Sequence, residues 1–485
     1  MRPGRLPRSL PGPLLGLLLA VGVVTVSWAL LLPPWQVPDE NYHFAYVQSL
    51  AENFELPTGS GEPQSSEQRL AADRSNADQT AQVLATKPEW SRSAYERWKL
   101  DDRALAQDAR GDGGGQNPAG GNPPLYYAYA SLAYWVSWNG DVFDRLYAMR
   151  LWSGLLLLVT TAATWLLVGE VVPGDRRLQL AGAALVGFQP MATFLSASVN
   201  PDAMLFALWA LVFWLGARAL RRGLSPGLAA ALFGATGLAV LVKATSYALV
   251  PAVLLVLAVA LRRAYPARRR AAALAAIAAL TLAIPIGGWL VAARALDRPV
   301  VNQAAATELG AEGVDLRQFG SYVWQYYLPK LPFQMAFPAA SSIPAYDVWF
   351  KTGWAAFGWL EVRFPEWVYA LLAAASALVA AAAAVAVFKK GRRAPLAVIA
   401  FCGLAAVGLI GGLHWVEYGQ IVQTGAPFNQ GRYVLPLLPV AGLCLAAALT
   451  LLAPRWRGVG LAVVLGGLFT LQLFSLGLVA ARFYA

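Results

Sequence analysis

Long apolar runs separated by short polar stretches make up most of the chain. A helix of about 20 apolar residues crosses the hydrocarbon core of a bilayer, so the runs predict transmembrane helices. Eleven such runs occur, at residues 14–33, 147–170, 178–198, 203–219, 227–242, 247–261, 271–293, 366–388, 394–413, 433–453 and 458–480. The pattern predicts an all-α integral membrane protein with about 11 transmembrane helices and no internal repeat.

Basic residues indicate how this bundle is oriented. They cluster in every second gap between the apolar runs, at Arg2/Arg5/Arg8, Arg176/Arg177, Arg218/Arg221/Arg222, Arg262 to Arg270, Lys389 to Arg393 and Arg455/Arg457. Because cytoplasmic loops are enriched in Lys and Arg, we expect a cytoplasmic N-terminus and an extracytoplasmic C-terminus. Residues 227–261 have basic flanks at both ends and must cross an even number of times. They therefore predict a hairpin with Lys243 at its outer turn.

The composition supports a multi-spanning protein, since 58% of the 485 residues are hydrophobic and 13% are charged. A net charge of +11 would suit nucleic acid, but the basic residues lie between apolar runs, as topology requires, so no nucleic-acid partner is expected. Cys402 and Cys444 fall within predicted spans and give no disulfide framework or zinc spacing. Richness in alanine, arginine and glycine is typical of a high-GC bacterium, which predicts the bacterial plasma membrane.

The predicted topology divides the chain into five parts. These are the first transmembrane helix (1–33), a first extracytoplasmic loop (34–146), transmembrane helices 2–7 (147–293), a second large extracytoplasmic segment (294–365) and transmembrane helices 8–11 (366–485). In the first loop, the glycine-rich stretch 111–121 predicts a flexible linker, and the Tyr- and Trp-rich run after it predicts a juxtamembrane helix. The second segment is aromatic and broken by proline, which favours a lid or wall along the membrane surface.

Two adjacent acids stand where the chain leaves the first predicted helix, in the stretch Pro38-Asp39-Glu40-Asn41-Tyr42-His43-Phe44. Proline cannot continue the first helix, and Asp39 is placed to cap a new one through residues 42–53. Asp39 and His43 then lie one helical turn apart, which suits a metal, a phosphate-bound cation or a proton acceptor. The simpler alternative is that the acids only begin a helix, where negative charge is favourable.

Further polar residues map to the same predicted membrane edge. Asn200 and Asp202 lie between predicted helices three and four, Lys243 at the hairpin turn, and His414, Glu417, Arg432 and Tyr433 between helices nine and ten. Charges near hydrocarbon are costly unless they are paired or functional, so this convergence predicts a site for a phosphate and a proton acceptor. Structural interpretations stay open: a turn at Asn200-Pro201-Asp202, snorkelling of Lys243, an interfacial anchor at Arg432, orientation of helix two by Arg145 and Arg150, and a structural His414.

Four motifs resemble a bacterial family of multi-spanning proteins of unassigned function that is grouped with the GT-C membrane glycosyltransferases. They are Pro38-Asp39-Glu40-x-x-His43-Phe44, Asn122-Pro-Pro-Leu-Tyr-Tyr, Ser198-Val-Asn-Pro-Asp202 and Gln430-Gly-Arg432-Tyr433. The run from Pro123 through Arg150 is also similar to the aminoarabinose and protein mannosyl transferases, where it forms a juxtamembrane helix. The resemblance implies a GT-C-like bundle with an acid of the first outer loop at the active site, a position that Asp39 matches.

The resemblance further implies an inverting transferase that moves a sugar from a polyprenyl-phosphate donor to an extracytoplasmic glycan, lipid or protein. Our hypothesis makes Asp39 the base, with a pKa raised by burial near another carboxylate. The full set comprises Asp39, Glu40 and Asp202 as catalytic residues, Lys243 and Arg432 on the donor phosphate, and His43, Asn122, Asn200 and Tyr433 on the substrates. A divalent cation, Mg or Mn, held by Asp39 and Asp202 is the one candidate cofactor.

Two rival functions come from other classes. One is a transporter or flippase of polyprenyl-linked sugars or other lipids, and the other is an assembly factor that uses the 34–146 loop as a binding platform. Transporters usually place ionisable residues near mid-membrane and often contain repeats, whereas these residues gather at one predicted edge. An enzyme needs its carboxylates and cations around one outward cavity, a transporter needs a path through the membrane, and an assembly factor needs neither.

Overall fold

The computed structural model describes residues 11–57, 60–89, 91–97, 108–264, 267–296, 315–336, 343–391 and 395–485; the predicted basic positions Arg2, Arg5, Arg8, Arg392 and Arg393 lie outside this part. Up to residue 200 the elements are α1 (Gly12–Leu31), α2 (Glu40–Asn53), α3 (Ser66–Arg74), α4 (Ala77–Thr80), α6 (Asp108–Gly111), η1 (Pro118–Gly121), α7 (Leu125–Val136), α8 (Val142–Val171), α9 (Arg176–Gly187) and α10 (Pro190–Ser196). Then follow α11 (Asp202–Arg222), α12 (Pro226–Val240), η2 (Ala244–Ala248), α13 (Leu249–Ala264), α14 (Arg268–Ala295), α16 (Leu316–Tyr327), η3 (Tyr346–Lys351), α17 (Thr352–Trp354), α18 (Glu366–Lys390), α19 (Leu396–Thr424), η5 (Gly431–Leu437), α20 (Leu438–Leu449), η6 (Pro454–Trp456) and α21 (Arg457–Tyr484).

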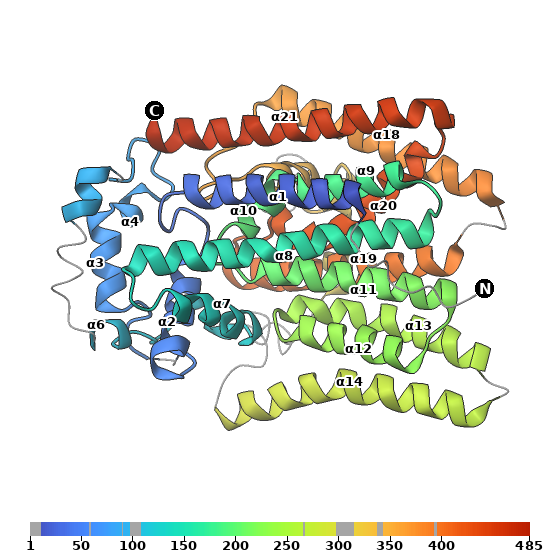
Figure 1. The fold of residues 1–485 in the computed structure, drawn as a ribbon, viewed down its shortest axis with the longest axis horizontal. Helices are drawn as coiled ribbons and strands as arrows, with labels where there is room; N and C mark the ends of the chain where they lie inside the picture. Colours follow the sequence, from blue (N-terminus) through green and yellow to red (C-terminus); the bar gives the residue numbers. More distant parts are fainter. Residues whose placement is uncertain are drawn as a thin grey trace.

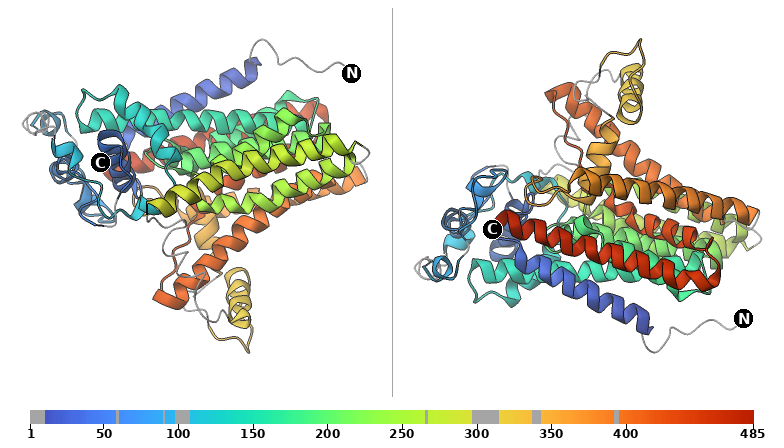
Figure 2. Two further views of the ribbon diagram at one scale, coloured as in Figure 1. Left: turned by 90° about the horizontal axis from the view of Figure 1, so that it is seen from below. Right: turned by 90° about the horizontal axis from the view of Figure 1, so that it is seen from above.

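Long helices run side by side along the longest dimension of the molecule, and the short helices α2 to α7 gather at one end, here called the loop end (Figure 1). α1 begins far from the loop end, whereas α21 finishes near it. The Tyr484 hydroxyl donates to the Leu31 carbonyl at 2.8 Å, so α1 and α21 both finish at the loop end. Figure 2 shows α16 projecting sideways from the bundle, next to α19.

The all-helical prediction is confirmed for the described residues, in which each predicted apolar run is mostly helical. Nine helices there are long and apolar enough to cross a membrane, or ten if the bent pair α9 and α10 forms one span. The remaining predicted run corresponds to α12, whose 15 residues are fewer than a straight span needs. Lys243 follows α12 and precedes η2, so it lies at the turn of the predicted hairpin.

The predicted end of the helix at 394–413 is wrong. α19 continues to Thr424 because Gly425, with a φ of 73°, is the first residue there to leave the helical conformation. His414 and Glu417 therefore lie inside α19 instead of in the loop after it. Tyr322 of α16 donates to Glu417 at 2.8 Å and lies 2.9 Å from His414 Nδ1, so these two residues hold α16 against α19.

The glycine-rich stretch after α6 is also not the flexible linker that its composition predicts. The amides of Gly114 and Gly115 donate to the carbonyls of Pro63 and Glu62, at 3.0 and 2.8 Å. A Cβ at Gly115 would lie 2.2 Å from the carbonyl carbon of Gly61, which no side chain permits. The glycines allow two backbone segments to pack directly on each other, so they order this part of the loop end.

Two buried ion pairs fasten the loop end to α8. Arg145 pairs with Glu67 of α3, and Arg150 pairs with Glu40 at the start of α2. Both arginine side chains are fully buried, so each charge is stabilised by its partner and not by water. The prediction that Arg145 and Arg150 orient the second helix thus has a structural basis in these pairs.

Candidate functional site

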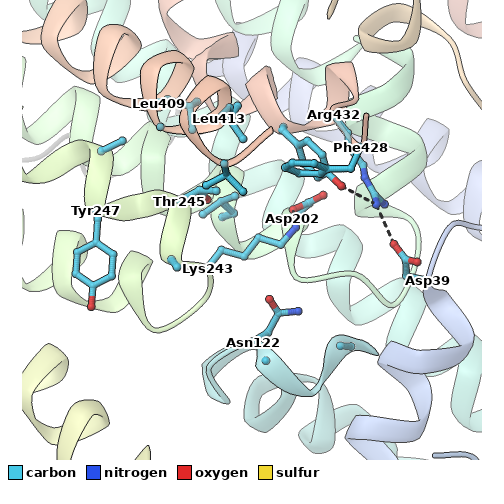
Figure 3. A pocket seen from close by; sticks show the side chains of 18 of the residues that line it. Asp39, Asn122, Asp202, Lys243, Thr245, Tyr247, Leu409, Leu413, Phe428 and Arg432 are labelled. Atoms are coloured by element: carbon cyan, nitrogen blue, oxygen red, sulfur yellow. Dashed lines mark hydrogen bonds and ion pairs between the residues drawn. The ribbon is translucent and has the colours of Figure 1, made fainter. Parts of the chain in front are cut away.

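A cavity of about 700 Å³ opens at the loop end between the membrane helices and the first loop. Seven of the nine residues predicted for the site line it: Asp39, His43, Asn122, Asp202, Lys243, Arg432 and Tyr433. Its other walls come from η1, η2, α13 and α19 and from residues just before η5. Figure 3 shows the side chains of Asp39, Asn122, Asp202, Lys243 and Arg432 converging from separate elements on one space. The predicted convergence of distant loops therefore occurs.

Asp39 and Arg432 form the first ion pair of the cavity. Arg432 Nη2 donates to Asp39 Oδ2 at 2.8 Å across a separation of 393 residues, and to the Tyr433 hydroxyl at 3.3 Å (Figure 3). Asp39 occupies the N-cap position of α2 in the left-handed conformation, with a φ of 65°, yet its side chain caps no helical amide. The carboxylate is 39% exposed and faces Arg432, so it is available to a molecule in the cavity.

The turn that carries Arg432 depends on Gly431. A Cβ at this position would lie 2.2 Å from the Gly353 nitrogen and 2.5 Å from the Trp349 carbonyl oxygen. The Gly431 amide also donates to Thr352 Oγ1 at 2.6 Å. The second extracytoplasmic segment therefore determines where Arg432 sits, because a glycine at position 431 lets the two backbones approach closely.

Asp202 and Lys243 form the second ion pair. Lys243 Nζ donates to Asp202 Oδ1 at 2.5 Å, and Asp202 Oδ2 has no hydrogen-bond partner among the described residues. Asn200 does not line the cavity; its Oδ1 accepts from the Asp202 amide at 2.9 Å. Asn200 thus shapes the turn that leads into α11, which supports its structural interpretation over direct substrate binding.

His43 lies one turn after Asp39 on α2 and borders the same cavity. Its Nδ1 is 3.0 Å from the Tyr127 hydroxyl, and burial lowers the pKa of His43 to about 4 despite the nearby Asp39 carboxylate. His43 is therefore neutral at neutral pH. Tyr127, in the Asn122-Pro-Pro-Leu-Tyr-Tyr motif, was not predicted as a site residue, although its motif was recognised.

The predicted raised pKa of Asp39 is wrong. Burial by itself would raise it, but the charges of Arg432 and Lys243, and that of His43 once acid protonates it, outweigh burial and lower the pKa of Asp39 below its ordinary value. Asp39 is therefore ionised throughout the neutral range. In the sequence the nearest charge to Asp39 is the carboxylate of Glu40, whereas tertiary structure brings the guanidinium of Arg432 to it.

Glu40 points away from the cavity. Its carboxylate accepts two hydrogen bonds from Arg150, at 2.8 and 2.5 Å, and one from the Val199 amide at 3.1 Å. Arg150 also donates to the carbonyls at the end of α1, those of Ala29, Leu32 and Pro33. The geometry does not support the predicted catalytic role of Glu40; the residue instead joins the Asp39 turn to the segment before Asp202.

One side of the cavity is apolar. Pro251 of α13 and Leu409 and Leu413 of α19 line it, and Figure 3 shows Leu409 and Leu413 on the side away from Asp39. Gly408 leaves no room for a side chain, since its Cβ would lie 2.8 Å from the Ala248 carbonyl oxygen. Both helices belong to candidate membrane spans, so helices apolar enough to lie in hydrocarbon form this wall. The cavity combines a charged end with an apolar side.

The residues at the charged end do not make a ready metal centre. Asp39 and Asp202 are each paired with a cationic side chain, and the described residues contain no group of three His, Cys, Asp or Glu side chains placed to hold an ion. The divalent cation at Asp39 and Asp202 stays a prediction.

Fold and cavity together define a multi-pass helical membrane protein with an amphipathic pocket at one end of its bundle. The chain belongs to the family described as "Predicted membrane protein (DUF2142)", whose family model matches residues 23–441. A search of curated protein sequences found no match.

Several solved structures are similar to the chain over almost its whole length. ArnT from Cupriavidus metallidurans, bound to undecaprenyl phosphate, is 14% identical with a TM-score of 0.47, and the match covers 96% of this chain and 74% of ArnT. AglB, an oligosaccharyltransferase from Archaeoglobus fulgidus in complex with an inhibitory peptide and a dolichol-phosphate, is 12% identical with a TM-score of 0.48, covering 97% of this chain and 56% of AglB. The arabinosyltransferase EmbB from Mycobacterium smegmatis is 14% identical with a TM-score of 0.38, covering 99% of this chain and 42% of EmbB.

The family match confirms the resemblance to a family of membrane proteins that was stated from the motifs, since the matched range contains all four of them. The chain spans about half the length of AglB and less than half of EmbB. Likeness at these identities assigns no activity, and the function proposed next depends on the pocket residues.

Proposed function

We propose that the protein is a membrane glycosyltransferase that moves a sugar from a polyprenyl phosphate to a hydroxyl acceptor. The observation that carries the proposal is the cavity itself, in which two cation–carboxylate pairs adjoin an apolar wall formed by membrane helices. A polyprenyl-phosphate sugar has the matching parts: an anionic phosphate, a polar sugar and a long apolar tail.

In this proposal Arg432 and Lys243 bind the donor phosphate through charge-assisted hydrogen bonds. Both side chains are mainly buried, with exposed fractions of 9% and 18%, so water screens them little. Their interaction with the phosphate strengthens as the bond to the sugar breaks and negative charge grows on the leaving group. The apolar tail lies against α13 and α19.

Asp39 accepts the proton of the acceptor hydroxyl. The hydroxyl oxygen attacks the anomeric carbon, the bond from that carbon to the phosphate oxygen breaks, and its electron pair leaves with the phosphate. A single displacement of this kind inverts the anomeric centre. Arg432 keeps the pKa of Asp39 low in the free protein. A phosphate that draws Arg432 toward itself weakens this pair, so donor binding makes Asp39 a stronger base.

Asp202 orients Lys243 toward the phosphate, and Asn122 and Tyr433 border the space left for the sugar. We place this site on the extracytoplasmic side of a bacterial plasma membrane, with a cytoplasmic N-terminus, because the basic clusters favour that orientation. The acceptor is then a glycan, lipid or protein of the cell envelope.

The decisive variant is Asp39→Asn, because asparagine keeps the shape of the side chain and also tolerates the left-handed backbone at this position. In a deletion strain that carries the variant, we expect mass spectrometry to show loss of the envelope sugar and accumulation of its lipid-linked donor. The matched control is Asp73→Asn, which changes an exposed aspartate outside the cavity and should restore transfer. Full transfer by Asp39→Asn would refute the base assignment. If the deletion strain loses the envelope sugar but its lipid-linked donor accumulates on the cytoplasmic leaflet, the result would favour the flippase instead.

A further inference from the structure

Three side chains form a hydrogen-bonded relay that ends at the cavity. Asn122 Nδ2 donates to the Tyr127 hydroxyl at 3.0 Å, and the same hydroxyl lies 3.0 Å from His43 Nδ1. Tyr127 is fully buried and His43 is 5% exposed, so bulk water does not compete for these groups. The relay links Asn122, which lies before α7, to Tyr127 in α7 and then to His43 in α2.

Counting protons assigns the direction of each bond. An amide nitrogen only donates, so the Tyr127 oxygen accepts from Asn122. Among the described residues the Tyr127 hydroxyl has one other partner, His43 Nδ1. If its single proton did not point there, a buried donor would be left unsatisfied, which is unfavourable. Tyr127 therefore donates to Nδ1, and the proton of the neutral His43 ring resides on Nε2.

The other edge of the His43 ring faces the ligand space. Nε2 has no hydrogen-bond partner in the described part of the chain, and it is not sealed from solvent. Because His43 lines the cavity, Nε2 is accessible from inside it. Lys243 and Arg432 line the same cavity, and Arg432 Nε has no partner among the described residues either.

We propose that Asn122 and Tyr127 fix His43 in the Nε2–H tautomer, so that His43 is a third N–H donor, with Lys243 and Arg432, for the anionic group bound in the cavity. The tautomer assignment stands independently of the function, whereas the identity of the anion as a lipid phosphate rests on the proposed function. His43 is thereby a positioning residue for the leaving group. The other ring tautomer would turn a lone pair toward the phosphate and repel it.

The tautomer can be read directly because the chain contains two histidines, His43 and His414. We expect NMR spectra of the full-length protein in nanodiscs, labelled with ¹⁵N-histidine, to show a protonated Nε2 and an unprotonated Nδ1 for His43. The His43→Gln variant assigns the signals by removing one set. A proton on Nδ1 of His43 in the wild-type protein would overturn the assignment.

Two variants test the relay itself. In Asn122→Asp the new carboxylate accepts the Tyr127 proton, so His43 must donate from Nδ1 and its tautomer should reverse. In Tyr127→Phe the Nδ1 partner is lost, so both tautomers should be populated. An unchanged Nε2–H tautomer in both variants would show that Asn122 and Tyr127 do not control it. His414 signals, which come from α19, are the internal control and should stay constant.

The donor role is tested by binding of farnesyl phosphate to the purified protein. His43→Leu removes the N–H group and should weaken binding about tenfold, whereas His43→Gln retains an N–H donor and should stay within about threefold of wild type. Equal affinity in His43→Leu would overturn the donor role. If the wild-type protein does not bind farnesyl phosphate, the proposed function fails together with this role, while the NMR spectra still decide the tautomer.

Discussion

The buried pair of Glu40 and Arg150 offers a quantitative test of how the loop end is held. Both side chains are fully buried, and Glu40 Oε1 also accepts from the Val199 amide. Glu40 follows Asp39, and Val199 precedes Asp202 by three residues. One carboxylate therefore links the two chain segments that carry the acids of the pocket. The perturbation is Glu40→Gln, which keeps the shape of the side chain and removes its charge.

Removing one partner of a buried pair typically costs about 3–5 kcal/mol, because the other charge is left uncompensated. Three backbone carbonyls still accept from Arg150 in the Glu40→Gln variant, so we expect the lower end, about 3 kcal/mol of unfolding free energy. Arg150→Met leaves an unpaired buried carboxylate and also removes the hydrogen-bond donor of those three carbonyls. We therefore expect a loss of about 5 kcal/mol of unfolding free energy. The double variant contains neither charge. Its loss of unfolding free energy should be smaller than the sum of the two single-variant losses by about 2–3 kcal/mol.

The assay is reversible unfolding in mixed micelles of mild detergent and SDS, followed by tryptophan fluorescence. The matched control is Glu366→Gln, because Glu366 forms an exposed pair with Lys351 at 3.0 Å and is 76% exposed. Exposed pairs contribute at most about 1 kcal/mol, so the control should unfold almost like the wild type. A Glu40→Gln variant as stable as that control, or a double variant whose loss equals the sum of the single losses, would refute the reasoning.

Three further predictions concern the pocket. Gly431→Ala should displace the Arg432 turn and weaken binding of farnesyl phosphate, since the added Cβ meets backbone atoms at 2.2 Å; binding as tight as wild type would show that the turn adapts. The pKa of His43 is lowered to about 4 in the folded protein, so at mildly acidic pH the unfolded chain binds more protons than the folded one. The free energy of unfolding therefore decreases as the pH is lowered. Between about pH 7.5 and pH 4.5 the wild type should lose about 2 kcal/mol more unfolding free energy than His43→Gln, and equal losses would contradict the burial argument. Treatment with EDTA should leave transfer intact, because Lys243 and Arg432 supply positive charge to the phosphate; loss of transfer that Mg²⁺ or Mn²⁺ restores would instead assign a metal to Asp39 and Asp202.

Much of the fold follows from local patterns. A membrane span depends on the apolarity of about 20 consecutive residues, so the apolar runs predicted where helices form, including the hairpin that places Lys243 at a turn. The errors are also local in origin. The pattern ended a helix near residue 413 because polar residues begin there, but the backbone stays helical until Gly425.

Tertiary structure alone decided whether Asp39 or Glu40 faces the cavity. Asp39 and Glu40 are adjacent, and no periodicity decides which of them meets Arg432 from a segment 393 residues away. The fold turns Asp39 into the cavity and buries Glu40 under Arg150, because successive side chains leave the backbone in different directions. The sign of the Asp39 pKa shift follows from the same contact. The sequence by itself determined the spans and the candidate residues, while the packing of distant segments decided which candidates share a cavity and which charges they meet there.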